Sequence, residues 1–255
     1  MTARLIMSLV LCIGLATGCS RKSAPVAGKI DDTEARLQAV MADLDRLMLE
    51  TNMEAAVVLM ENTWRNPDFA ARRGWLFSIL LDLNLRSDRL QQAEDLYLKS
   101  LDDAELARSG FEVLGNYYQS QTNRSLTLAW TQRLLDRRLP PDLMERAFVW
   151  RNGIVRETQG IEALISLVPE CTKRFDAPAS TRIMAEMFNG LMVKARYGDA
   201  KAVLTELEKT SPMPPSLLYL AVSGHTRIAA REERWTDLET ETGRAMAVLP
   251  DADLD

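Results

Sequence analysis

Side chains capable of acid–base or nucleophilic chemistry are scarce in this chain. Its one histidine is His225, and the nearest nucleophile in sequence is Ser223, two residues away. Residues at that separation do not share a helix face, so the two side chains are not placed to act as a nucleophile and its base. The pattern predicts a surface or groove histidine rather than a general base.

Other arrangements that could support catalysis are also missing from the sequence. Carboxylate pairs such as Glu206 with Glu208, and Glu232 with Glu233, stand among Lys and Arg residues and are typical of solvated helix faces. Metal sites need several His, Cys or carboxylate groups that converge, and no such spacing occurs. No glycine-rich phosphate-binding loop follows a strand pattern. We therefore expect no enzyme, no cofactor and no metal; a hydrolase would require acids from distant segments to converge in one cleft.

Composition favours a helical protein that does not bind nucleic acid. The 255 residues carry 31 basic and 36 acidic side chains, for a net charge of −5, whereas a nucleic-acid partner would need a basic face. Only 12 residues are glycine, and Leu, Ala, Arg, Glu and Met are frequent. This composition is typical of α-helices.

The first 18 residues have the features of a secretory signal peptide. "MTAR" carries one positive charge, and residues 5–18, "LIMSLVLCIGLATG", carry none. A spanning helix needs about 20 apolar residues, so this run predicts a signal peptide over 1–18 rather than a membrane anchor.

Cys19 follows this apolar run directly and admits two interpretations. Ala16-Thr17-Gly18 fits the small-x-small pattern of ordinary cleavage, which would release a soluble protein that begins at Cys19. The same residues resemble a bacterial lipobox, although the position three before the cysteine is Ala16 where Leu is usual. The lipobox resemblance implies that Cys19 is acylated, and that Ser20 directs the protein to the periplasmic face of the outer membrane. Residues 19–29 would then be a lipidated N-terminus and tether, and residues 30–255 the folded domain.

Prolines mark a repeat with a period of 37 residues. Pro67, Pro141, Pro178 and Pro215 are separated by multiples of 37, with Ala104 in the remaining position. Proline suits the first turn of a helix, where its missing N–H would have no partner. The period divides the chain into six units: 30–66, 67–103, 104–140, 141–177, 178–214 and 215–251.

Aligned positions of the six units share their chemistry. The fifteenth position is apolar in every unit: Leu44, Leu81, Tyr118, Val155, Met192 and Ala229. Cys171 shares an aligned position with Met60, Tyr97, Leu134 and Ala245, which predicts a buried packing thiol. Polar breaks such as "LRSDR" at 85–89 separate two apolar-periodic halves in each unit. We expect each unit to be a helix, a short turn and a second helix, stacked on its neighbours to form a continuous core.

These units resemble the tetratricopeptide repeat (TPR) family over roughly residues 30–251. "FEVLGNYY", with Phe111, Leu114, Gly115 and Tyr118, matches the family's first helix, and "GDAKAVL" at 198–204 is similar to its second. The period is longer than the family's ~34 residues, and no unit holds the complete consensus, so related helical-hairpin repeats remain an alternative. The resemblance implies an all-α solenoid of about six antiparallel helix pairs that binds proteins in a groove.

Carrying the family's groove positions onto this register selects seven candidate partner-binding residues: Arg72, Trp75, Glu112, Asn116, Arg146, Arg156 and Glu186. Aromatic and arginine side chains dominate many binding interfaces, and arginine can hold a carboxylate through two hydrogen bonds. The resulting prediction is an envelope lipoprotein that acts as a scaffold or assembly factor for envelope proteins. The alternative is a binding protein for a small molecule or glycan, with a closed pocket built on Trp75, Trp150 and Tyr117.

Overall fold

The computed structural model describes residues 32–248 of the chain. Within this range the protein forms twelve α-helices and one 3₁₀ helix and contains no strand, so the predicted all-α class is confirmed. The expected signal peptide (1–18), Cys19 and the tether (19–29) lie outside the described residues. None of the described helices is both long and apolar enough to cross a bilayer.

The helix bounds can be compared with the predicted units; α9 begins at Ala177, one residue before the unit 178–214. The bounds are α1 Asp32–Leu49, α2 Met53–Arg65, η3 Pro67–Arg72, α3 Arg73–Arg86, α4 Leu90–Leu98, α5 Ala104–Ser120, α6 Arg124–Leu135, α7 Pro141–Thr158, α8 Gly160–Arg174, α9 Ala177–Val193, α10 Tyr197–Leu207, α11 Pro215–Arg231 and α12 Trp235–Val248.

Several helices start at a proline or at an acidic or amide cap, whereas α3, α4, α8 and α10 have neither. Pro141, Pro178 and Pro215 lie in the first turns of α7, α9 and α11, as their spacing predicts. At α5, which lacks the proline, the Asp103 side chain accepts hydrogen bonds from two backbone N–H groups of the first turn. Pro67 differs, because it opens the 3₁₀ helix η3, and Phe69 leaves helical geometry (φ −102°, ψ 18°) before α3 begins.

Four helices end in the same hydrogen-bonded turn. After α9, the Leu191 carbonyl accepts from the N–H of Arg196, and the Met192 carbonyl accepts from the N–H of Ala195. This is the Schellman pattern, which requires a residue in the left-handed region and usually uses glycine there. In these four turns the left-handed residue is not glycine: the residues are Thr51, Asp88, Ala195 and Glu233.

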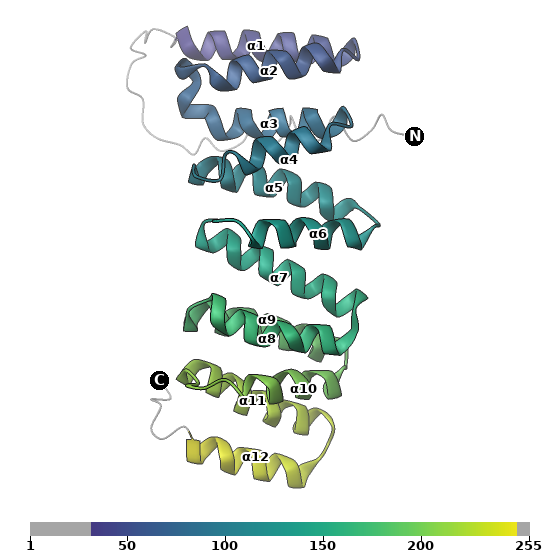
Figure 1. The fold of residues 1–255 in the computed structure, drawn as a ribbon, viewed down its shortest axis with the longest axis vertical. Coiled ribbons are helices and arrows are strands. Elements are labelled where there is room, and N and C mark those ends of the chain that lie inside the picture. The colour runs from purple at the N-terminus through teal and green to yellow at the C-terminus, as the bar shows by residue number, and fades with distance from the viewer. Residues whose placement is uncertain (1–31, 249–255) are drawn as a thin grey trace, which may run out of the picture.

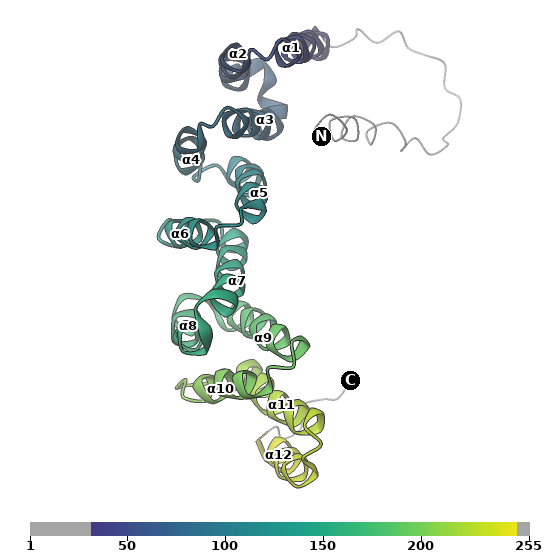
Figure 2. The ribbon, with the colours of Figure 1, turned by 90° about the vertical axis from the view of Figure 1, so that its right-hand side faces the viewer.

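The helices succeed one another along the long axis of an elongated molecule (Figure 1). In the turned view, α1, α3, α5, α7, α9 and α11 form one layer, and α2, α4, α6, α8 and α10 form the other (Figure 2). We call these the odd layer and the even layer. The odd layer is curved, because α7 lies closer to the side of the even layer than α3 and α11 do (Figure 2).

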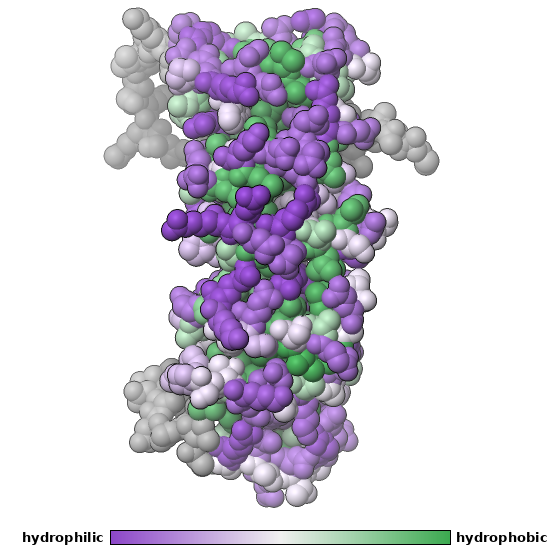
Figure 3. Space-filling model, viewed as in Figure 1, coloured by the Kyte–Doolittle hydropathy of each residue, from purple (hydrophilic) through white to green (hydrophobic). Residues whose placement is uncertain are grey.

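Apolar residues at the aligned positions form the core between the two layers. Leu44, Leu81, Tyr118, Val155 and Ala229 are buried, and Met192 is half-buried. One cluster runs from Phe77 in α3 to Ile228 in α11, and a second fills the space among α1, α2, η3 and α3. The face seen in Figure 3 is mainly hydrophilic, with smaller hydrophobic areas between the charged side chains.

Candidate functional site

A pocket opens where two helices of the odd layer are held apart. The pairs α3 and α5, α7 and α9, and α9 and α11 pack directly, whereas α5 and α7 come close at few or no points along their backbones. Large side chains fill the intervening space. The spacing is therefore set by side chains between α5 and α7, and by direct helix packing between α3 and α5 and from α7 to α11.

Aromatic rings form the floor of this space. The rings of Phe111 and Trp150 lie 5.6 Å apart at 30°, and Trp150 meets Trp130 edge-on at 5.7 Å. Gly115 makes room for the indole, since a Cβ on this residue would lie 2.6 Å from Trp150 Cη2. The floor is thus an aromatic surface that depends on glycine at residue 115.

The pocket above this floor has a volume of about 330 Å³. Exposed polar side chains surround it, and we call it the α5–α7 pocket. It is lined by Phe111, Glu112, Gly115, Asn116, Gln119, Glu145, Arg146, Val149, Trp150 and Glu186.

Two of the three carboxylates at the pocket already bind a guanidinium. Arg146 Nη1 donates to Glu112 Oε1 at 2.6 Å, and its Cζ lies 4.9 Å from the centre of the Phe111 ring. This hydrogen bond to Glu112 raises the pKa of Arg146. Arg182 of α9 donates to both Glu145 oxygens, at 2.9 and 2.7 Å. Glu186 is exposed and has no ion pair among the residues that the structure describes.

The structure brings four of the seven predicted groove residues together. Glu112, Asn116, Arg146 and Glu186 line the α5–α7 pocket. Arg72 ends η3 and Trp75 lies in α3, 46% exposed, and neither lines the pocket. Arg156 lies at the far end of α7 against Gly190 of α9, where its Nε is buried without a hydrogen bond.

The three aromatic residues expected to form a small-molecule site do not converge on one cavity. Only Trp150 lines the α5–α7 pocket, whereas the ring of Tyr117 packs edge-on against Tyr118 at 5.4 Å. Sequence analysis did not place Phe111, Glu145 and Gln119 at the site. Phe111 belongs to the TPR-like pattern of the sequence, but its position beneath Arg146 depends on how α7 lies relative to α5.

The prediction that His225 is a surface or groove residue is wrong, because the side chain is only 7% exposed. It packs among α10, α11 and α12 beside a small polar cavity of about 170 Å³. Its Nε2 lies 3.4 Å from Glu208 Oε1 and makes no hydrogen bond among the described residues. Burial lowers the pKa of His225, and the attraction of Glu208 and Glu241 offsets this only partly.

Cys171 is fully buried, as its aligned position predicts. Burial raises the pKa of the thiol to about 12, so it is protonated at neutral pH. A protonated, enclosed thiol is a poor nucleophile and serves as packing.

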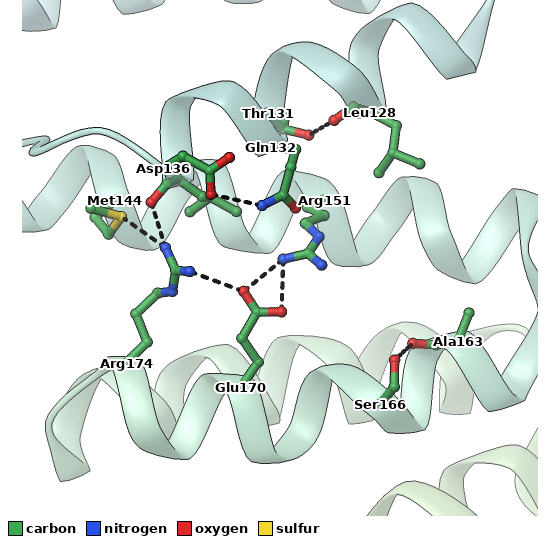
Figure 4. A network of polar contacts seen from close by, with 11 residues as sticks. Leu128, Thr131, Gln132, Asp136, Met144, Arg151, Ala163, Ser166, Glu170 and Arg174 are labelled. Atoms are coloured by element: carbon green, nitrogen blue, oxygen red, sulfur yellow. Dashed lines mark hydrogen bonds and ion pairs between the residues drawn. The ribbon is translucent and has the colours of Figure 1, made fainter.

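Polar contacts also join neighbouring units away from the pocket. On α8, Glu170 lies between two guanidinium groups: it accepts from Arg151 of α7 at 2.7 and 2.8 Å, and pairs with Arg174 at 3.2 Å (Figure 4). Arg174 also donates to the Leu135 carbonyl at the end of α6, at 2.5 Å. These contacts fix α6, α7 and α8 to one another, and none of Arg151, Glu170 and Arg174 lines the α5–α7 pocket, so we assign them a structural role.

Among the described residues, no group of three or more His, Cys, Asp or Glu side chains is placed to hold a metal ion. Comparisons with protein-family models, curated proteins and solved structures find no match for this chain. The assignment of function therefore depends on the α5–α7 pocket.

Proposed function

We propose that this protein is a lipid-anchored scaffold of the bacterial cell envelope that holds a partner protein at the α5–α7 pocket. In this proposal the twelve helices form a TPR-like solenoid of six pairs, and Cys19 carries the anchor. The single observation that carries the binding role is the pocket itself, an aromatic floor surrounded by exposed polar groups.

The solenoid is supported by the order and contacts of the helices. Each helix packs on helices adjacent in the chain or one position further along, as in α3 with α5 and α8 with α10. Such an array buries its apolar stripe only by stacking neighbouring units. It leaves long faces exposed, which suits the binding of extended segments.

The form of the pocket favours a macromolecular partner over a small ligand. Small-molecule sites bury most of their ligand in a largely apolar cavity. Here Glu112, Asn116, Gln119 and Arg146 are exposed, so a bound molecule would remain open to solvent. Protein interfaces commonly combine an aromatic centre with such a polar rim.

Site-specific cross-linking in native envelopes tests this proposal. A photo-cross-linking amino acid replaces Gln119, which is exposed at the pocket, and a second chain carries it at Gln92, which is exposed on α4 in the even layer. We expect one defined partner at residue 119 and none at residue 92. The triple variant Asn116→Ala, Arg146→Ala, Glu186→Ala should lose this product while retaining its helicity. Cross-links of equal yield at both positions, or no product at residue 119, would contradict the proposal.

A further inference from the structure

We infer that the α5–α7 pocket binds the side chain of a lysine or arginine from the partner protein. This inference rests on the proposed function and names the chemistry that the site selects. It reverses the expectation that arginines of the groove bind carboxylates of the partner.

Arg146 is the only cationic residue that lines the pocket, and its charge is already paired with Glu112. Its guanidinium donates to Glu112 at 2.6 Å and covers the face of Phe111 at 4.9 Å. An incoming carboxylate would approach three carboxylates, Glu112, Glu145 and Glu186, at the same time. Repulsion between these like charges disfavours an anionic ligand.

The one charged side chain on the lining that has no ion pair among the described residues is a carboxylate. Glu186 of α9 faces the pocket and has no ion pair among the described residues, whereas Glu145 shares its charge with Arg182. With three carboxylates and one guanidinium on its lining, the pocket attracts a positive charge. Glu186 supplies a specific partner for that charge.

The floor of the pocket is also suited to a cation. A guanidinium or ammonium group is attracted to the face of an aromatic ring, and tryptophan is the strongest such partner. The chain shows this contact internally, since Arg146 lies over Phe111. Trp150 is half-buried beside Phe111 and offers a second ring to an incoming cation.

The volume of the pocket is large enough for one long side chain. Pockets for drug-sized ligands have volumes of roughly 300–1,000 Å³. The 330 Å³ found here is at the lower end of that range. It therefore suits one long basic side chain, whose apolar stem lies on Trp150 and whose charge meets Glu186.

Nuclear magnetic resonance of the full chain in detergent micelles, labelled with ¹⁵N at its five tryptophans, tests the inference. The probes are the capped tripeptides acetyl-Gly-Lys-Gly-amide and acetyl-Gly-Arg-Gly-amide, with the Gln and Glu tripeptides as controls. The Trp150 indole signal is assigned by its loss in Trp150→Phe. We expect saturable shifts of this signal with the two basic probes, and no shift of the exposed Trp235.

Charge variants at exposed positions separate a specific site from general attraction. Glu186→Gln should weaken binding of the basic probes by about three- to fivefold, the effect of one exposed ion pair. Glu239→Gln removes the same charge from an exposed position on α12 and should leave the affinity unchanged. Arg182→Gln frees Glu145 and should strengthen binding by about twofold.

Several results would overturn the inference. These are a shift of Trp150 with the Gln or Glu probe equal to that with the Lys probe, an unchanged affinity in Glu186→Gln, or tetramethylammonium binding as tightly as the basic tripeptides. The last result would point to a small quaternary amine instead of a protein side chain. A cross-linked partner at residue 119 without binding of basic probes would refute this inference alone, whereas binding of the probes without a cross-linked partner would refute the proposed scaffold role.

Discussion

Glu94 of α4 and Arg133 of α6 are joined by two hydrogen bonds, from Arg133 Nη2 to Oε1 at 2.6 Å and from Nη1 to Oε2 at 2.8 Å. The two residues are 39 positions apart and belong to successive units. Glu94 is 3% exposed and also accepts from the Tyr118 hydroxyl, while the side chain of Arg133 is about half exposed. A buried carboxylate therefore depends on a partner from the next unit.

This asymmetry in burial predicts unequal costs for removing the two partners. Arg133→Met leaves a buried carboxylate with only the tyrosine hydroxyl, and we expect it to lower the free energy of unfolding by about 2–4 kcal/mol. Glu94→Gln keeps a polar group of the same shape and leaves the half-exposed Arg133 free to reach water. We expect its cost to be about 1–2 kcal/mol. Urea denaturation followed by circular dichroism measures both values, and equal costs for the two variants would contradict this account.

His225 is the one histidine of the chain, so its titration should dominate the pH dependence of stability near pH 6. Burial holds the pKa of His225 below its ordinary 6.5 in the folded state, so below that pH the unfolded chain takes up a proton that the folded chain does not. Stability is therefore full above about pH 6.5 and falls as the pH decreases through the folded pKa. In His225→Gln this part of the pH dependence should disappear. Thermal melts at about pH 5.5 and 7.5 provide the comparison, and an identical loss of stability in both proteins would show that other groups are responsible.

The left-handed residue at the end of α1 offers a stabilising substitution. Thr51 has φ 57°, a conformation that is costly for a β-branched residue. Thr51→Gly should raise the free energy of unfolding by about 1 kcal/mol, since the strain removed exceeds the added freedom of the unfolded chain. Asp88→Gly is the matched change at the end of α3, and its gain should be smaller because Asp tolerates this region better. A lower melting temperature in Thr51→Gly would disprove the strain at this turn.

Membrane attachment is predicted to depend on one side chain outside the described residues. Cys19→Ala should move the protein from the membrane fraction to the soluble fraction, because acyl chains supply the anchoring free energy. Fractionation with metabolic labelling by a fatty-acid analogue measures both properties. The matched variant Cys12→Ala lies in the apolar run and should keep both the label and the attachment. Unchanged partitioning in Cys19→Ala would show that the protein is held by other means.

The helices could be predicted from the sequence because their signals are local. Pro141 and Pro215 start helices, and residues such as Leu81 and Leu44 are buried at the same position of different units. The burial of His225 also had a local signal, since Val222, Ile228 and Ala229 place it next to an apolar stripe. The α5–α7 pocket had none. The pocket depends on contact between Gly115 in one unit and Trp150 in the next. The period of the repeat does not reveal which neighbouring helices, here α5 and α7, lack close backbone contact.

The separation of α5 from α7 has a mechanical consequence. Close backbone contact between the α1–α5 and α6–α12 segments is made mainly by α5 with α6. Further contact is made by side chains such as Phe111, Tyr118, Trp130 and Trp150. Fewer close helix contacts join the chain here than at the other steps between successive helices, so we expect bending to concentrate at this joint. The α1–α5 and α6–α12 segments would then rotate relative to one another about the pocket. A partner side chain bound between α5 and α7 would set the angle between the two segments. Binding at one pocket would then change the end-to-end length of the whole molecule.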